Sequence, residues 1–286
     1  MAKTTIAIMY DFDKTLSEND MQNYTFIQNL GMNPKDFWEE VGDIVLQNKM
    51  DKILAYMYLM VKKCQEKSIP LTKEYLMTCG KAIKLHKGVS TFFSRINEFA
   101  KKHDAVVEHY IISSGISDII RGTTVAKYFK EIYGCEFLYN QYGVAIWPSL
   151  TINFTQKTQF IFRISKGVLD IRDDENLNKK SDFKKIPYEN MIYIGDGLTD
   201  IPCMKLIREK GGHSIAIYPP KDKNKVSQLV KDKRINSVCA ADYSKESQLD
   251  KTVKLMIEKI VVMRHLKEKE AEQYKSFDEL LNGNKE

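Results

Sequence analysis

The sequence predicts an α/β protein with a doubly wound parallel sheet and an inserted all-helical segment. Three short apolar runs rich in β-branched residues have the length of buried strands, and polar residues follow each of them: residues 6–10, 110–112 and 191–194. Helical patterns alternate with these strands, which favours parallel strands with helices on both faces of the sheet. No strand pattern occurs between Ser17 and Lys87, so this stretch is expected to be helical.

Four helices are predicted in this inserted segment. Residues 21–30 have apolar side chains at helical spacing, and Gly31 suits the C-terminal stop. A second helix is expected to begin at Pro34, and a third to include residues 53–61. Thr72 is the expected N-cap of a fourth helix over residues 72–85. The Tyr, Trp and Met side chains of this segment are expected mostly to form its own core.

The rest of the chain predicts alternating elements around the same sheet. Gly143 is the expected turn of a β-hairpin over residues 137–147. The charge-rich residues 170–185 are expected to form an exposed loop or helix extension, and the polar tail after Lys267 to fray. The expected helices are 89–100, 158–167 and 249–266, and the expected further strands are 106–112, 214–218 and 238–241. The predicted domains are therefore a core of residues 1–16 and 88–286 and a helical unit of residues 17–87.

Composition limits the class of protein. The 286 residues are 43% hydrophobic and 29% charged, as in an ordinary soluble protein, and no apolar run has membrane-spanning length. The N-terminus lacks the charged region followed by an apolar region that is typical of a signal peptide. The five cysteines show neither the spacing of metal ligands nor an obvious pattern of disulfide pairing. We therefore expect reduced thiols, a cytoplasmic protein and no membrane partner.

The net charge of +6 invites a nucleic-acid interpretation. However, the lysines are spread along the chain and mixed with acids, as in Lys179 and Lys180 beside Asp182. A solvated surface without a nucleic-acid partner is the expected outcome.

Two acidic loops carry the candidate chemistry. Asp11 and Asp13 follow the first strand, and Asp196 and Asp200 follow the strand at residues 191–194. Ligands of open α/β sheets bind at the carboxyl ends of the strands. Carboxylates so close together repel each other unless a cation lies beside them, and a divalent metal with a substrate phosphate is the usual solution. For Asp11 and Asp13 considered alone, the alternative is that they cap a helix at a strand-to-helix turn.

These motifs resemble those of the haloacid dehalogenase superfamily in its phosphatase branch. Asp11, Asp13 and Thr15 match the motif Asp-x-Asp-x-Thr, and the motif Gly-Asp-Gly-x-x-Asp contains Asp196 and Asp200. A strand that ends in Ser113 and a helix that begins near Lys157 match the two weaker motifs in the right order. The resemblance covers residues 5–262 and is closest to phosphoserine phosphatase-like members, which implies a Rossmann-like core with a helical cap inserted after the first motif.

The resemblance also implies a role for each residue. Asp11 would be the nucleophile that forms an aspartyl-phosphate, and Asp13 the general acid and base. Ser113 would donate to a phosphoryl oxygen, and Lys157, or its rival Lys166, would offset negative charge. Mg²⁺ would be held by Asp11, Asp196 and the backbone carbonyl of Asp13, with Asp200 bound through a metal water or orienting the lysine.

Residues near the substrate are expected to be Thr15, Ser114, Gly115 and Asp20. Asp20 lies near the place where the phosphoserine enzymes have an acidic residue for the substrate amine. Those enzymes also use an Arg of the cap against the substrate carboxylate, but residues 17–87 contain no Arg, which argues against phosphoserine.

The resulting expectation is a Mg²⁺-dependent phosphomonoesterase for a small phosphorylated metabolite. The alternatives are a phosphotransferase, a phosphoprotein phosphatase or a catalytically silent binding module. The acid at Asp13 favours full hydrolysis, because relatives that retain the aspartyl-phosphate have Thr at this position.

Overall fold

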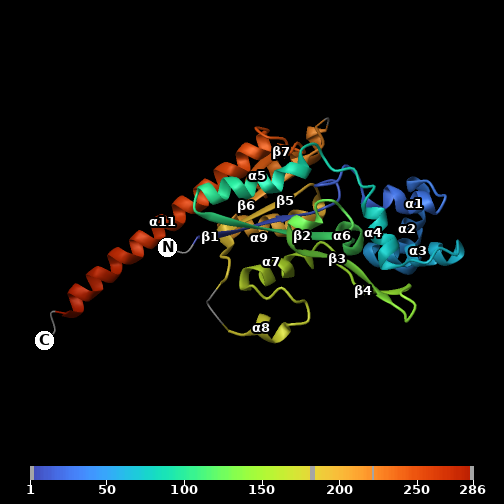
Figure 1. Cartoon of the computed structure of the whole chain (residues 1–286), viewed down its shortest axis with the longest axis horizontal. Coiled ribbons are helices and arrows are strands. Elements are labelled where there is room, and N and C mark those ends of the chain that lie inside the picture. The colour runs from blue at the N-terminus through green and yellow to red at the C-terminus, as the bar shows by residue number, and fades with distance from the viewer. Residues whose placement is uncertain (1–2, 181–183, 221, 284–286) are drawn as a thin grey trace.

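A single seven-stranded sheet forms the centre of the computed structural model, which describes residues 3–180, 184–220 and 222–283 (Figure 1). The strand order is β4-β3-β2-β1-β5-β6-β7. All neighbouring strands are parallel except β3 and β4, which form the expected hairpin at one edge with Gly143 at φ +74°. The predicted α/β class with a mostly parallel sheet is confirmed. The strands are β1 (Thr4–Tyr10), β2 (Ala105–Ile116), β3 (Phe129–Tyr139), β4 (Ala145–Leu150), β5 (Met191–Gly195), β6 (His213–Tyr218) and β7 (Ser237–Ala240).

Helices cover both faces of the sheet, as expected of a doubly wound fold. On one face lie α5 (Val89–Lys102) and α11 (Gln248–Gly283), and on the other lie α7 (Lys157–Lys166) and α9 (Ile201–Glu209) (Figure 1). Because both faces are covered, β1, β5 and β6 are buried along almost their whole length.

Residues 17–87 form a group of helices beside the carboxyl end of the sheet (Figure 1). They are α1 (Thr25–Asn29), α2 (Pro34–Asn48), α3 (Lys52–Glu66) and α4 (Lys73–Gly80). The side chains of Asn33, Asp51 and Thr72 accept hydrogen bonds from backbone N–H groups in the first turns of the last three, so the predicted cap at Thr72 is confirmed.

Two boundaries in this segment differ from the prediction. The single helix expected over residues 21–30 is divided into a 3₁₀ turn, η1 (Met21–Asn23), and α1, because Tyr24 has a non-helical ψ of −99°. The fourth helix ends at Gly80 instead of residue 85. At Gly80 the backbone comes so close to the core that a Cβ would lie 2.1 Å from the carbonyl oxygen of Ile119.

Gly122 makes a second close contact between the helical segment and the core. It follows α6 (Ser117–Arg121), and a Cβ on it would lie 1.9 Å from the carbonyl oxygen of Met77. On the other side, α3 packs against β4, and the N–H of Ala145 donates to the carbonyl of Leu71. The helical segment is therefore attached to the core at α6 and at β4.

The last helix is longer than predicted. α11 continues to Gly283, past the expected end at residue 266, and extends beyond the sheet (Figure 1). Residues 267–275 are mostly Lys, Glu, Gln and Ala, which are good helix formers even without a buried face.

The remaining elements are short. Residues 170–185 contain α8 (Asp174–Asn178), and residues 181–183 of that charge-rich stretch lie outside the described residues. The others are η2 (Ala126–Tyr128), η3 (Tyr188–Asn190), η4 (Leu198–Asp200), η5 (Lys223–Val226) and α10 (Ser227–Lys231).

The five cysteines are all buried free thiols. None of the helices in the described part of the chain combines the length and the apolar character needed to cross a bilayer.

Candidate active site

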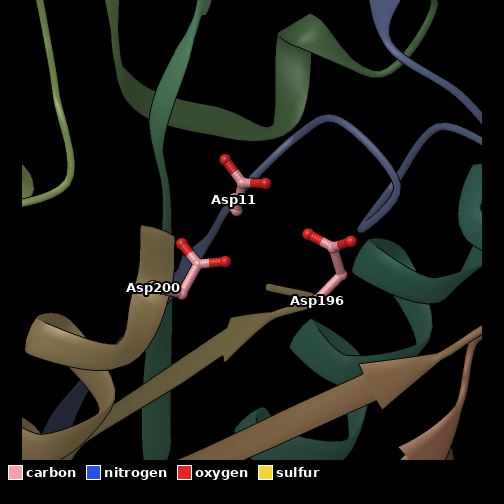
Figure 2. Close-up of side chains that lie close together, drawn as sticks. All are labelled: Asp11, Asp196 and Asp200. Atoms are coloured by element: carbon pink, nitrogen blue, oxygen red, sulfur yellow. The ribbon is translucent and has the colours of Figure 1, made fainter. Parts of the chain in front are cut away.

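Three carboxylates meet at the carboxyl end of the central strands. Asp11 directly follows β1, Asp196 follows β5, and Asp200 ends η4 before α9 begins. Carboxylate oxygens of the three residues lie within 4.8 Å of one another, and Figure 2 shows them around one small space. The parallel register explains the meeting, because Tyr10 at the end of β1 pairs with Ile194 of β5. All three residues are buried.

Lys157 provides the cation of this cluster. It is the first residue of α7 and is buried, and its Nζ donates to Oδ1 of Asp11 at 2.9 Å and to Oδ1 of Asp200 at 2.8 Å. Lys166, at the other end of α7, instead donates to the backbone carbonyls of Leu177 and Lys179. The geometry therefore favours Lys157 as the lysine of the site.

Burial and charge shift the pKa values of this cluster. Burial raises the pKa of Asp11 to about 7, and the nearby Asp200 and Asp196 also raise it, while Lys157 opposes the shift. Burial alone would lower the pKa of Lys157, but Asp11 and Asp200 outweigh it and the pKa is raised. Lys157 is therefore protonated at neutral pH and holds Asp11 and Asp200 together.

A tyrosine also supports Asp200. The buried hydroxyl of Tyr193 on β5 donates to Oδ1 of Asp200 at 2.7 Å. A Cβ on Gly195 would lie 2.5 Å from Oδ2 of the same carboxylate, so glycine is required at this position. Asp200 is thus fixed by Lys157, Tyr193 and the shape of the loop.

Asp13 lies in a different environment from Asp11. Its Oδ1 accepts a hydrogen bond of 2.8 Å from the backbone N–H of Met21. Burial raises its pKa well above the usual range, and Asp20 and Asp11 raise it further. A raised pKa favours the protonated form of this carboxyl, which is the form that a general acid requires. Its carboxylate is not part of the three-carboxylate cluster, which leaves the expected metal contact to its backbone carbonyl.

The end of β2 forms another wall of the site. Oγ of Ser113 accepts a hydrogen bond of 3.0 Å from the N–H of Gly115. Oγ of Ser114 is buried and has no hydrogen-bond partner among the described residues. A Cβ on Gly115 would lie 2.1 Å from Cε of Met21 and 3.1 Å from Oδ2 of Asp13, so the loop of Asp13 can approach only a glycine.

Thr15 and Asp20 are both expected near the substrate, but they differ in whether they line the cavity described below. Thr15 is fully buried and does not line the cavity described below. Asp20 does line it, but both of its carboxylate oxygens accept hydrogen bonds from Nζ of Lys14, at 2.8 and 2.6 Å. Lys14 has a left-handed φ of 57°, which is uncommon for a residue with a side chain.

A cavity of about 520 Å³ opens between the helical segment and the ends of the strands. The core contributes all the catalytic candidates: Asp11, Asp13, Ser113, Ser114, Gly115, Lys157 and Asp196. The helical segment contributes Asp20, Gln22, Trp38, Lys52, Ile53 and Tyr56. The core thus contributes the candidate catalytic residues, and the inserted segment lines the rest of the cavity.

Sequence reasoning missed several residues of this cavity. Gln22 lies on η1, Trp38 on α2, and Lys52 and Tyr56 one turn apart on α3, and no short motif joins the three elements. Lys14 lies within the Asp-x-Asp-x-Thr motif, directly after Asp13. This place in the sequence is the signal from which a cation beside Asp13 and Asp20 could have been predicted.

The three-carboxylate cluster fits a magnesium ion. Mg²⁺ prefers oxygen ligands and is usually bound by one or two carboxylates together with waters. Buried carboxylates from three segments supply such oxygens, and their mutual repulsion, offset only in part by Lys157, favours a cation between them.

Comparison with known proteins agrees with this arrangement. The family model of haloacid dehalogenase-like hydrolases matches residues 8–205. An uncharacterized protein of Borreliella burgdorferi is 26% identical in an alignment 274 positions long, with 85% of this chain and 93% of that protein covered.

Solved structures share the fold at low identity. A HAD family hydrolase from Salmonella enterica serovar Typhi has a TM-score of 0.54 at 18% identity, with 83% of this chain and 67% of that one covered. A phosphoserine phosphatase with an analogue of its phospho-aspartyl intermediate has a TM-score of 0.52 at 15% identity, with 88% and 99% covered. With a family model that spans most of the chain and the two acidic motifs brought together at one site, the protein belongs to the haloacid dehalogenase-like hydrolases.

Proposed function

We propose that the protein is a Mg²⁺-dependent phosphomonoesterase that acts through an aspartyl-phosphate on Asp11. The observation that carries the proposal is the difference between the two carboxyl groups of one loop. Burial raises the pKa of both groups, but Asp11 is paired with the cation Lys157, whereas Asp13 accepts a hydrogen bond from the N–H of Met21. One group is thus suited to attack phosphorus and the other to protonate the leaving group.

The protein groups divide the two chemical steps between them. Oδ of Asp11 attacks phosphorus, and Asp13 gives its proton to the leaving alkoxide. Asp13, now ionised, takes a proton from the attacking water, which hydrolyses the aspartyl-phosphate and frees Asp11. Lys157 offsets the charge on Asp11, and the hydroxyl of Ser113 donates to a phosphoryl oxygen. Asp11, Asp196 and the backbone carbonyl of Asp13 would hold Mg²⁺, with Asp200 bound through a metal water, and the ion would supply charge neutralisation at the phosphoryl group.

The cavity supports a small substrate. A volume of about 520 Å³ is in the range of small-molecule sites, and helices of residues 17–87 line its outer part. This cover argues against a folded phosphoprotein as the substrate. The five buried free thiols are consistent with action in the cytoplasm.

The cap side chains favour a leaving group that carries hydroxyls over an amino acid. Asp20, the residue expected to bind a substrate amine, already forms an ion pair with Lys14. Gln22 is buried on the cavity wall, and its Oε1 has no hydrogen-bond partner among the described residues. A hydroxyl of a polyol or sugar phosphate would supply the missing donor, and the ring of Trp38 gives an apolar wall beside it.

Hydrolysis of p-nitrophenyl phosphate tests the reaction itself. The purified protein should release p-nitrophenol with Mg²⁺ and stop with EDTA. The absence of Mg²⁺-dependent hydrolysis across a broad panel of phosphate esters at several pH values would contradict the proposal. Added alcohol acceptors distinguish transfer from hydrolysis, and inorganic phosphate should be the phosphorus product throughout.

Gln22→Leu tests the leaving-group assignment. The variant should raise KM for polyol and sugar phosphates and leave kcat/KM for p-nitrophenyl phosphate, which has no hydroxyl donor, within about twofold of wild type. Efficient hydrolysis of phosphoserine over all polyol phosphates would contradict this part of the proposal alone.

A further inference from the structure

A second cavity, of about 720 Å³, lies at the opposite edge of the sheet, where the strands begin. Thr5 near the start of β1 and His213 at the start of β6 line it, together with one side of α11. Figure 1 shows α11 passing the end of the sheet at which the N-terminus lies. Six residues of extended strand, roughly 20 Å at 3.3 Å per residue, separate Thr5 from Asp11. This cavity is therefore distinct from the candidate active site.

Basic side chains surround the cavity. One carboxylate, Glu189, is among the lining residues, and it is already paired with Lys267 at 2.8 Å. Arg264 is paired with Glu268, which does not line the cavity. The six basic residues of the wall are Lys3, Lys184, Lys185, Lys259, Arg264 and Lys267.

Four of these cations form no ion pair with a carboxylate of the described residues: Lys3, Lys184, Lys185 and Lys259. Of these, Lys184 lies over the ring of Tyr188, 5.1 Å from its centroid. Elsewhere on this protein, basic side chains are commonly paired one turn along a helix, as Lys205 is with Glu209. Four cations around one hollow repel each other, and this repulsion decreases when an anion lies among them.

The floor of the cavity is apolar. Ile260 is buried, and Met263 and Pro187 also face the hollow. Burial, together with Lys259, lowers the pKa of His213, so this imidazole is neutral at pH 7 and adds hydrogen-bonding capacity without charge. An apolar floor under a ring of cations differs from a flat basic surface, which would suit an extended polyanion.

We propose that this cavity binds a small organic anion that carries two or more negative charges on an apolar or aromatic body. The volume of about 720 Å³ suits a ligand of this size. The apolar body would lie on Ile260 and Met263, and the charged groups would reach Lys3, Lys185 and Lys259. This is a binding site in addition to the catalytic one, and it lies at the other end of β1.

Pyrene-1,3,6,8-tetrasulfonate is a suitable probe. It joins an aromatic body to four permanent anions, it has no phosphate ester to hydrolyse, and its fluorescence anisotropy reports binding directly. We expect saturable binding with one probe per chain. Orthovanadate with Mg²⁺ should occupy the active site and leave this binding unchanged.

Two charge reversals on one helix provide the matched comparison. Lys259→Glu is in the cavity, and Lys269→Glu is exposed on the same helix outside it. Lys259→Glu should raise the Kd of the probe by about tenfold or more, whereas Lys269→Glu should change it by less than about threefold. Both variants should unfold at the wild-type temperature within a few degrees, because both side chains are exposed.

Three results would overturn the proposal. Binding that does not saturate would mean that the probe meets only a diffuse charge field. An equal loss in both variants would mean that the net charge, and not this cavity, attracts the probe. Displacement of the probe by orthovanadate would place it in the active site.

Discussion

Replacing Asp11 by Asn should abolish turnover and stabilise the metal-free protein. The folded structure holds the pKa of Asp11 at about 7, against an ordinary value of 3.8. Below pH 3.8 the carboxyl is protonated in both the folded and the unfolded chain, and it contributes no difference. As the pH rises from 3.8 to 7, the unfolded chain loses this proton first, so the folded state loses stability relative to the unfolded one.

The size of the effect follows from the same two values. A difference of about three pKa units corresponds to about 4 kcal/mol of unfolding free energy above pH 7. Asn is nearly isosteric and carries no charge, so the variant avoids this cost, while Lys157 keeps its bond to Asp200. We expect a gain of about 2–4 kcal/mol at pH 8, or roughly 5–10 °C in Tm for a chain of this size, and almost none at pH 4.

Thermal unfolding of both proteins in EDTA, from pH 4 to pH 8, measures this gain. Asp13 also has a raised pKa, chiefly from burial and in part from Asp11, so Asn at position 11 reduces that shift as well and adds to the expected gain. Mg²⁺ should then stabilise the wild type more than the variant. A gain that does not grow with pH, or a loss of stability at pH 8, would refute the electrostatic reasoning. Residual activity within about tenfold of wild type, about 1.4 kcal/mol in barrier, would refute the assignment of the nucleophile.

Two further substitutions test the site, and a pair of glycine substitutions tests the packing of the helical segment on the core. Asp13→Asn should impair hydrolysis of alkyl phosphates most and let a phosphoryl adduct accumulate on Asp11. Mass spectrometry after a brief acid quench would detect this adduct. Equal losses of activity for alkyl and phenolic esters, without any adduct, would contradict the acid–base role of Asp13. Lys157→Met should destabilise the metal-free protein by about 3–5 kcal/mol, because two buried carboxylates lose their cation, and Mg²⁺ should restore part of this; denaturant unfolding with and without Mg²⁺ measures both. Gly122→Ala should cost about 1–3 kcal/mol, since its Cβ would lie 1.9 Å from the carbonyl of Met77. Gly42→Ala in α2, where a Cβ meets nothing within 4 Å, should instead be neutral or slightly stabilising, and equal effects of the two glycine substitutions would contradict the close packing of the cap on the core.

The parts of the site that follow regular strands could be predicted from the sequence. Asp11 and Asp196 stand directly after apolar runs, and parallel pairing then brings them to one edge of the sheet. Lys157 could be placed only as one of two candidates, because both ends of α7 carry a lysine and the direction of the helix relative to the sheet decides between them.

The substrate side of the site could not be predicted in this way. Gln22, Trp38 and Lys52 line one cavity through the tertiary packing of η1, α2 and α3, and their spacing in the sequence follows no helical or strand period that would indicate this. The break at Tyr24 is a second example, because the apolar spacing of residues 21–30 is helical although the backbone is not. Tertiary contacts, such as that of Met21 with Asp13, override the local preference there.

The position of β1 at the centre of the sheet has a consequence for biosynthesis. Ala7 pairs with Glu108 of β2 and with Met191 of β5, so its two partners follow it by 101 and 184 residues. At about 5–20 residues per second, a ribosome would need roughly 10 to 40 s to deliver the second partner. During that time the apolar β1 has no sheet to join, whereas the helices of residues 17–87 can form from local contacts. Asp11, at the end of β1, is therefore synthesised well before the second of the strands beside it, and this order gives nascent chains time to associate through β1.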